Sequence, residues 1–323
     1  MIPITTAYAR RMSTELDLLD LRVIRAVAET GGITAAAAAL GYSQPAVTQR
    51  IRRAEGVLGQ PLVLRSGRGV AVTEAGRRLA SHAVHVQAAL DAARQDLDSL
   101  AGGVTGTLRL AGFPSASPTL VPSILSSLRV SHPSVTLSYL EVEPPAALEL
   151  VRDGAIDLAL TFSYPGDGQR SDAPRVEGLR TTPLFRDTTM LVGPRGTFGA
   201  HADLAAVRAE RFIGGCPRCR GHLLAVCRAA GFEPEIVLET DNALAVTGLV
   251  AAGLGIALLP GLSLLTAGTP AGVDVRPLPA DADRIVQVVH SRGAERVPAV
   301  AAGLRAVLGL DAATFGLRPA DRG

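Results

Sequence analysis

The stretch of residues 34–58 constrains the fold of this chain more than any other part of it. Its first segment, 34–40, is almost entirely alanine and is followed by Gly41, which can take the positive φ that ends a helix. Ser43 can cap a second helix, and Pro45 would stand in its first turn, where no backbone N–H is needed. The stretch therefore predicts two short helices joined by a tight turn.

The second of these helices would have one apolar face and one polar face. Its apolar residues recur at helical spacing: Val47, Ile51, Ala54 and Leu58. The opposite face carries amides, a hydroxyl and guanidinium groups, which suit base edges and phosphates: Gln44, Thr48, Gln49, Arg52 and Arg53. This pattern predicts a helix-turn-helix whose second helix lies in a DNA major groove. The alternative is an alanine-rich helical hairpin in an ordinary core, with a solvated polar face.

The residues after the second helix predict a basic hairpin. Two short β-like runs, 62–65 and 70–72, flank a Gly-rich tip, which is the form of a wing. Arg65 and Arg68 in this hairpin could reach phosphates or the minor groove. The formal net charge of the 323-residue chain is only +2, so whole-chain charge does not indicate a nucleic-acid partner. Its distribution does, because between Ser43 and Arg78 seven Arg stand against two Glu.

A long helix is predicted next. Apolar residues alternate at steps of four and three over three heptads, which forms a coiled-coil seam: Leu79, Ala83, Val86, Leu90, Ala93, Leu97 and Leu100. One helix cannot bury such a stripe by itself, so the seam predicts a partner helix from a second copy of the chain. The alternative is packing against other parts of the same chain.

From Gly106 onward the pattern changes to alternating short strands and helices. Strands are expected at 107–111, 135–141, 156–162, 190–192, 236–239, 255–259 and 285–291. Helices are expected at 118–131, 144–152, 204–210, 221–230, 242–252 and 297–308. This alternation favours parallel α/β sheets, and the length allows two small sheets with a cleft between them.

Ligands of open α/β sheets bind at the carboxyl ends of the strands, beside helix N-termini. Four such segments are candidates for lining the cleft, and their residues are Ser115, Ala116, Ser117, Thr161, Phe162, Ser163, Gly214, Gly215, Asp241 and Asn242. Hydroxyl groups at the first of these ends favour an anion such as a carboxylate. For Ser115 and Ser117 the alternative is plain helix capping.

Together these segments resemble one known family. The pattern AA…L…SQPAVT…I…E…LG…L…R…G…T.AG extends over the first part of the chain and resembles the winged helix-turn-helix of LysR-type transcriptional regulators. The runs LRLAGFPSASPTLVPSIL, VRDGAIDLAL and LVAAGLGIALLP resemble the co-inducer domain of the same family. Departures from the family pattern are Ile33, Thr34, Val63 and Ala54, which concern packing and leave the DNA-facing set in place.

The resemblance implies an α/β multidomain fold with a division of the chain that we adopt as an expectation. An N-terminal tail (1–16) precedes a winged helix-turn-helix domain (17–75, with the helix-turn-helix at about 35–54) and a linker and dimerisation helix (76–103). A two-subdomain α/β effector-binding domain of periplasmic-binding-protein type follows (104–312), and a C-terminal tail ends the chain (313–323). Subdomain I would hold 104–164 and 266–312, and subdomain II 165–265.

The function that the resemblance implies is sequence-specific transcriptional regulation in response to a small-molecule effector. It adds Thr34, Ser43, Pro45 and Ala46 to the DNA-contacting set and makes Ser115 the position that best matches an effector contact. The implied partners are double-stranded DNA with an inverted repeat, a second copy of the chain in a homodimer or homotetramer, and RNA polymerase, with no membrane.

The cysteines leave three interpretations open. Cys216, Cys219 and His222 form C-x-x-C-x-x-H, and Cys227 lies further on. A zinc site would need all four, but Cys227 lies off the helix face of His222. A redox pair is favoured by Arg218, Arg220 and a following helix N-terminus, which would lower a thiol pKa. The third interpretation is three reduced thiols without a signalling role.

Other classes of protein find little support. No Ser–His–acid set and no glycine-rich nucleotide fingerprint after a strand is present, so we expect neither an enzyme nor a bound cofactor or metal. No apolar region follows Arg10 and Arg11, and three Cys are too few for a disulfide framework, so we expect a cytoplasmic protein. Met12 is a candidate for the start of translation. The rival hypothesis is a cytoplasmic small-molecule-binding α/β protein or enzyme with an incidental helical N-terminus.

Overall fold

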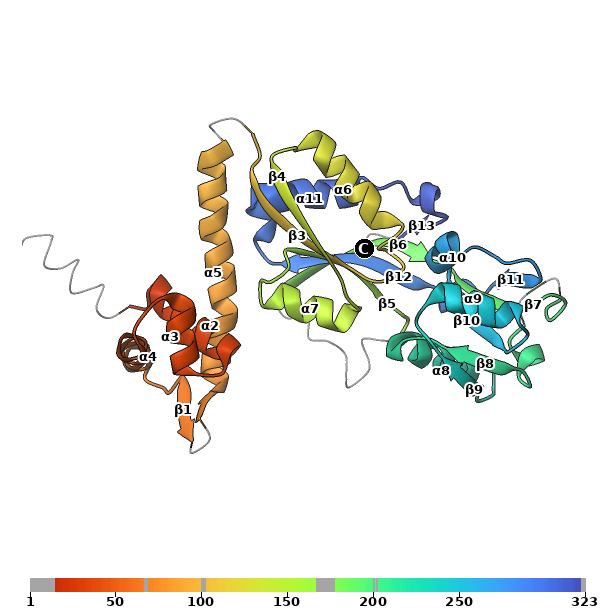
Figure 1. Ribbon diagram of the computed structural model, residues 1–323, viewed down its shortest axis with the longest axis horizontal. Helices are drawn as coiled ribbons and strands as arrows, with labels where there is room; N and C mark the ends of the chain where they lie inside the picture. The colour runs from red at the N-terminus through yellow and green to blue at the C-terminus, as the bar shows by residue number, and fades with distance from the viewer. Residues whose placement is uncertain are drawn as a thin grey trace, which may run out of the picture.

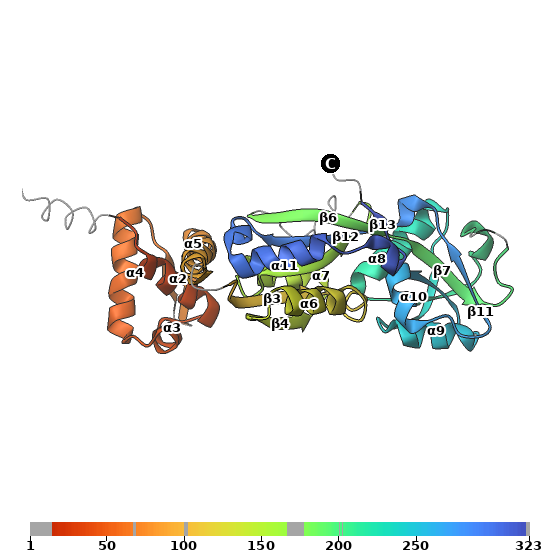
Figure 2. The ribbon, with the colours of Figure 1, turned by 90° about the horizontal axis from the view of Figure 1, so that it is seen from above.

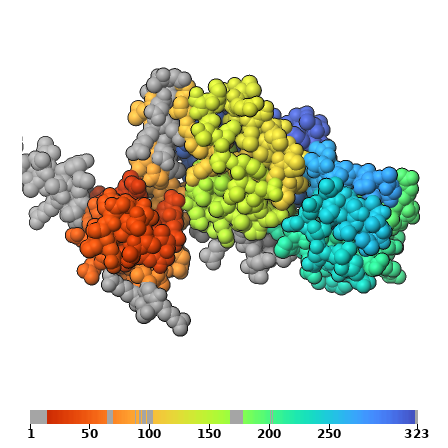
Figure 3. Space-filling view, in the orientation of Figure 1, coloured from red at the N-terminus to blue at the C-terminus, as the bar shows by residue number. Residues whose placement is uncertain are grey.

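The computed structural model describes residues 15–66, 69–99, 103–166, 178–199, 201 and 203–320. The expected N-terminal tail up to residue 14, with Met12, lies outside the described residues. A small N-terminal helical unit, one long helix and two α/β lobes follow one another along the longest axis (Figure 1 and Figure 2). In the space-filling view the two lobes, yellow-green and cyan-blue, stand side by side (Figure 3). None of the helices in the described ranges is long and apolar enough to cross a membrane.

The N-terminal unit contains the predicted helix-turn-helix. Helices α2 (Leu18–Thr30), α3 (Ile33–Leu40) and α4 (Gln44–Leu58) enclose a core in which Ile24, Ala36 and Ile51 are almost fully buried. The side chains of α3 are small, so α2 and α4 both pack closely against it. The turn has the predicted chemistry: Gly41 ends α3 with φ +71°, and the Ser43 hydroxyl accepts a hydrogen bond from the backbone N–H of Ala46 at the start of α4.

The wing and the linker helix follow directly. Strands β1 (Val63–Ser66) and β2 (Gly69–Val72) form an antiparallel pair, and α5 (Glu74–Ser99) begins two residues later. Gly76 in the first turn of α5 lies so close to β1 that a Cβ there would meet the Leu62 carbonyl oxygen at 2.3 Å. The start of α5 is therefore fixed against the wing. The wing is in turn fixed to α4, because the Glu55 carboxylate accepts hydrogen bonds from the backbone N–H groups of Leu62 and Val63.

The first lobe is built on a six-stranded sheet of order β13-β6-β12-β5-β3-β4. Its strands are β3 (Gly106–Gly112), β4 (Val135–Glu141), β5 (Leu158–Ser163), β6 (Leu179–Asp187), β12 (Arg284–Ser291) and β13 (Arg318–Pro319). Helices α6 (Leu120–Ser131) and α11 (Pro298–Leu308) cover one face, and α7 (Pro144–Arg152) covers the other (Figure 1).

The second lobe is built on a five-stranded sheet of order β11-β7-β10-β8-β9. Its strands are β7 (Thr189–Pro194), β8 (Arg211–Gly214), β9 (Glu235–Glu239), β10 (Ile256–Pro260) and β11 (Val273–Pro277). Helix α8 (Pro217–Ala229) packs on one face, while α9 (Ala243–Ala251) and α10 (Gly261–Ala267) pack on the other.

The sheets correct several expectations. They are mixed rather than parallel, because β12 runs antiparallel to both β5 and β6, and β7 antiparallel to both β10 and β11. The expected subdomain boundaries are wrong: β6, assigned to subdomain II, pairs with β12 in the first sheet, and β11, assigned to subdomain I, pairs with β7 in the second. Neither β6 nor β11 was expected as a strand, and partner choice in a sheet depends on residues distant in sequence.

Two smaller expectations also fail. The helix expected at 204–210 is only a short 3-10 helix, Ala205–Val207. The expected C-terminal tail is packed as far as residue 320: β13 pairs with β6, and Phe315, Leu317 and Ala320 are buried. The C-terminal departure depends on pairing with a strand that is distant in sequence, which local propensity does not include.

Candidate functional site

One face of α4 is open to solvent and polar. Gln44, Pro45, Gln49 and Arg52 are exposed, as are Thr34 on α3 and the capping Ser43, while Ala46 and Thr48 are partly exposed. Arg52 has no ion-pair partner among the described residues. Because Gly41, Ser43 and Pro45 fix where α4 begins, its first two turns present amides and a guanidinium outward from a rigid support.

Arg53 does not belong to this face, which corrects the sequence expectation. Its guanidinium forms an ion pair with the fully buried Asp20 of α2 and donates to the carbonyl oxygen of Glu15 at 2.8 Å. Arg50 binds the same carboxylate at 3.2 Å and Asp17 at 2.6 Å. Arg50 and Arg53 are one turn apart on the side of α4 that faces α2, so their charges hold the helices together.

The two wing arginines that were expected to contact DNA cannot be placed by their side chains. Arg65 pairs with Val70 through the backbone of β1 and β2, and its side chain lies outside the described residues. Arg68 at the tip also lies outside them.

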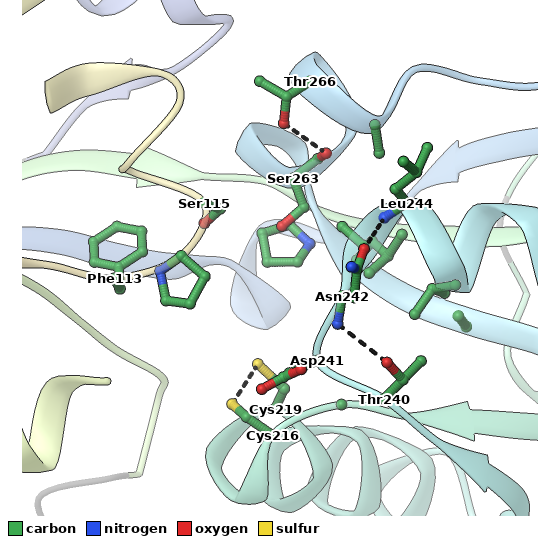
Figure 4. Close-up of a pocket in the computed structure, with 18 of the residues that line it drawn as sticks. Phe113, Ser115, Cys216, Cys219, Thr240, Asp241, Asn242, Leu244, Ser263 and Thr266 are labelled. Carbon is green, nitrogen blue, oxygen red and sulfur yellow. Dashed lines mark hydrogen bonds between the residues drawn. The ribbon is translucent and has the colours of Figure 1, made fainter. Parts of the chain in front are cut away.

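A cleft of about 490 Å³ lies between the two lobes (Figure 4). Five of the expected effector residues line it: Ser115, Phe162, Gly215, Asp241 and Asn242. Ser115 and Phe162 come from the first lobe and the other three from the second, so a ligand in the cleft would contact both lobes.

The other five expected effector residues do not line the cleft, and the sequence expectation is wrong for them. Ala116 is fully buried, and the Ser117 hydroxyl is engaged with that of Tyr139 at 2.5 Å. Thr161, Ser163 and Gly214 alternate with residues that do face the cleft, because successive side chains of an extended strand point to opposite faces.

Arg284 is the most buried charged group of the cleft, and the sequence analysis missed it. Its guanidinium is 2.7 Å from the carboxylate of Asp187, donates to the Ser115 hydroxyl at 2.7 Å and lies 4.6 Å from the ring centre of Phe162. Since Asp187 neutralises it, its charge is already balanced within the protein. No local sequence signal marks Arg284, because its partners are 97 and 169 residues away.

Arg284 and Asp187 also stand where the chain crosses between the lobes. β6 ends at Asp187 and β7 begins at Thr189, and the chain returns through residues 278–283 to Arg284. The Thr189 hydroxyl donates to the Ala282 carbonyl oxygen at 2.6 Å, which joins the two crossings. A contact at Ser115 is therefore one hydrogen bond away from the two chain crossings between the lobes, which we call the hinge.

Glu143 is a second residue that the sequence analysis missed. It lines the cleft, and its Oε2 is buried without a hydrogen-bond partner in the described part of the chain. Burial raises the pKa of Glu143 to about 7, and the nearby Cys216 adds to the rise. A signal existed, because Glu143 follows the carboxyl end of β4 and precedes the Pro144 that opens α7.

Two helix N-termini at the cleft are occupied by side chains of the protein itself. The N–H groups of Leu244 and Ala245 at the start of α9 donate to the Asn242 side chain, and Leu262 N–H at the start of α10 donates to Asp187. These helix ends are thus already satisfied internally.

Two of the three thiols lie at the cleft. Cys216 and Cys219 line it with their sulfur atoms 3.3 Å apart, whereas Cys227, further along α8, is buried in the core of the second lobe. The His222 ring stacks on Tyr164 with 3.8 Å between ring centres. Within the described ranges, no group of three or more His, Cys, Asp or Glu side chains is arranged to hold a metal ion.

Comparison with known proteins agrees with this architecture. Residues 18–77 match the family model of the bacterial regulatory helix-turn-helix protein of the lysR family, and residues 101–310 match the LysR substrate binding domain. A relative from Streptomyces viridosporus, described as a probable hydrogen peroxide-inducible genes activator, is 32% identical over 81% of this chain and 83% of its own length.

Solved structures of other proteins share the fold of this chain. An OxyR cysteine mutant of Corynebacterium glutamicum is 26% identical with a TM-score of 0.54, and the match covers 91% of each chain. Full-length CbnR complexed with its target DNA shares the fold, with a TM-score of 0.52 and 24% identity over 90% of this chain and 98% of that one. With both halves matched in the observed order, the chain belongs to the LysR family of transcriptional regulators.

Proposed function

We propose that this LysR-type regulator binds inverted-repeat DNA as a dimer, and that a small molecule in the cleft between its lobes changes that binding. The observation that carries the proposal is the exposed polar face at the start of α4. Gln44, Gln49 and Arg52 stand there on a helix whose other faces are packed or ion-paired. Amide and guanidinium groups read base edges in the major groove, and CbnR is a neighbour of the same fold solved with its target DNA.

The dimer is supported by the outer part of α5. Leu79 and Ala83 of the predicted seam are covered by the chain itself, whereas Val86, Leu90 and Leu97 remain exposed, Leu97 to 68%. A stripe of exposed Val and Leu on a long helix is stabilised by a second such helix. Two-fold pairing through α5 would place two copies of α4 at two half-sites of an inverted repeat.

The effector would act through the hinge. A ligand that contacts Ser115 competes with the hydrogen bond from Arg284, which is ion-paired to Asp187 at the point where the chain crosses between the lobes. Ligand binding that favours one angle between the lobes shifts the population toward it. The orientation of the first lobe, on which α5 packs, changes with that shift.

A blocked cleft tests this part of the proposal. Leu244 lines the cleft from α9 and is 65% exposed, so Leu244→Trp places an indole where a ligand would bind. The matched control is Leu308→Trp, at an exposed position of α11 that does not line the cleft. A reporter driven by the promoter that the protein binds should lose its metabolite-dependent change with Leu244→Trp and keep it with Leu308→Trp. If both variants respond like the wild type and melt at the same temperature, the effector does not act from this cleft.

A further inference from the structure

The cysteine pair at the start of α8 has no part in the function described so far. Cys216 precedes the helix and Cys219 stands in its first turn, so the two side chains lie one above the other at the helix N-terminus. Their sulfur atoms are 3.3 Å apart, with the Cys216 thiol donating to Cys219, and both residues line the cleft (Figure 4). Cys216 is buried and Cys219 partly exposed, and both border the cleft, so a molecule as small as a peroxide reaches them from there.

We propose that Cys216 and Cys219 form a dithiol site that reacts with hydroperoxides entering the cleft and closes to a disulfide. The observations that carry it are the distance between the two sulfur atoms, their shared position at the cleft, and the contacts of the Cys219 sulfur with the Cys216 thiol and the Tyr164 hydroxyl. The proposal adds to the regulator function without depending on it, because the thiol chemistry requires no DNA.

Cys219 is the nucleophile of the pair. Its sulfur accepts the hydrogen bond from Cys216 and lies 3.7 Å from the Tyr164 hydroxyl. The hydrogen bond from Cys216 lowers the pKa of Cys219 although burial opposes the shift, and the same pairing raises the pKa of Cys216. A thiolate is the reactive form toward peroxides, so the first oxidation falls on Cys219.

The charges that stabilise this thiolate differ from those expected from the sequence. Arg218 donates to the carbonyl oxygen of Phe162 at 3.1 Å, and Arg220 is ion-paired with Glu239 at 2.8 Å. Arg284, which lines the same cleft from the first lobe, contributes to the lowered pKa of Cys219 even though it is ion-paired with Asp187.

The reaction balances with a hydroperoxide as the only co-reactant. The Cys219 thiolate attacks one peroxide oxygen, the O–O bond breaks, and the leaving oxygen takes up a proton as water or an alcohol. Cys219 is oxidised to a sulfenic acid, and the peroxide is reduced. Cys216 then attacks the Cys219 sulfur: an S–S bond forms, the S–O bond breaks, and the hydroxide leaves with the Cys216 proton as water.

The geometry allows the second step without rearrangement of the helix. A disulfide joins sulfur atoms about 2 Å apart and Cα atoms about 4–7 Å apart, and residues three apart in a helical turn meet the second condition. Rotation of the two side chains is sufficient to move the sulfur atoms from 3.3 Å to bonding distance. Loss of the negative charge on Cys219 after oxidation also removes a cause of the high pKa of Cys216.

Cys227 provides the matched internal control. It is fully buried among Phe212 and Leu223, does not line the cleft, and burial raises its pKa to about 11. It therefore should neither react with peroxide nor pair with the other two thiols.

The test uses the reduced full-length protein and hydrogen peroxide, followed by alkylation and peptide mass spectrometry. We expect the wild type and Cys227→Ala to lose two thiols per chain, with two hydrogen atoms missing from the peptide that holds Cys216 and Cys219. Cys216→Ser should stop at a sulfenic acid on Cys219 that dimedone traps. Cys219→Ser should consume peroxide at least about tenfold more slowly, because the activated thiolate is gone.

Three results would overturn the proposal: a wild type that keeps three thiols, a disulfide that includes Cys227, or equal rates for Cys219→Ser and the wild type. Circular dichroism of each variant establishes that it is folded before oxidation. Since the assay contains no DNA, its failure would leave the DNA-binding proposal standing, and the reverse also holds.

Discussion

Arg52 and Arg53 are neighbours on α4, yet the structure gives them opposite roles. Arg52 is exposed and without an ion-pair partner among the described residues, whereas Arg53 binds the buried carboxylate of Asp20. We therefore expect Arg53→Ala to destabilise the N-terminal unit and Arg52→Ala to weaken DNA binding without destabilising it. The pair of variants separates a DNA-reading arginine from one that holds two helices together.

The magnitudes follow from the contacts. A hydrogen bond to a buried charged group is worth about 1.5–3 kcal/mol, and Arg53→Ala also removes the bond to the Glu15 carbonyl oxygen. Because Arg50 remains beside Asp20 at 3.2 Å, the carboxylate is not left wholly unpaired, and we expect a loss of about 2 kcal/mol. Arg52→Ala should change stability by less than about 0.5 kcal/mol but cost about 1–3 kcal/mol of specific DNA binding.

Amide hydrogen exchange measured by mass spectrometry is the suitable assay, since it reports the opening of α2 and α4 separately from the two lobes. A loss of about 2 kcal/mol corresponds to roughly thirtyfold faster exchange in Arg53→Ala. Arg52→Ala should exchange at the wild-type rate while its affinity falls in a fluorescence anisotropy titration. Unchanged exchange in Arg53→Ala together with lost DNA affinity would show that Arg53 reads DNA and that our assignment of the helix face is wrong.

Three further predictions concern the cleft, the dimer and the wing. Because the pKa of Glu143 is raised to about 7, the folded chain keeps a proton on this carboxyl that the unfolded chain releases above about pH 4.5. The contribution of Glu143 to the free energy of unfolding therefore becomes more unfavourable as the pH rises from about 4.5 to 7. Glu143→Gln should therefore raise the free energy of unfolding at pH 8 by about 1–2 kcal/mol, a value discounted for the partial exposure of the side chain, and by little at pH 4.5. Urea unfolding at the two pH values measures this difference. Equal gains at both pH values would contradict the prediction. Leu90→Asp on the exposed stripe of α5 should give monomers in light scattering at micromolar concentration, while Ala89→Asp, one position off the stripe, should not. Gly76→Ala forces a Cβ against the Leu62 carbonyl oxygen and should cost about 1–3 kcal/mol, seen as faster amide exchange in β1 and β2; wild-type exchange would show that the contact relaxes freely.

The helix-turn-helix could be predicted because its determinants are local. Gly41, Ser43 and Pro45 specify the turn within a few residues, and the apolar spacing after Pro45 specifies the buried face. The error at Arg53 arose from a contact with Asp20, 33 residues away, which a helical projection of α4 alone does not include.

The α/β fold class of the effector domain could be predicted from the sequence. The pairing of its strands and the role of Arg284 in the cleft could not. Half of the ten residues expected from strand ends line the cleft, among them Ser115 and Asn242. Alternation along the strands excluded others, such as Thr161, which is fully buried. Arg284 could not be predicted, because its importance comes from joining Asp187 and Ser115 across more than ninety residues of chain.

The central claim is that the exposed face of α4, repeated in a dimer, reads an inverted repeat. A gel shift with the full-length protein and DNA from upstream of its own gene, at about 50 and 200 mM salt, tests it most directly. We predict a specific complex whose affinity falls by roughly a thousandfold or more between the two salt concentrations, as expected for six or more phosphate contacts. Footprinting should show two half-sites about one or more helical turns apart, and Arg52→Ala should weaken both. No complex with any upstream segment at the lower salt concentration would contradict the account.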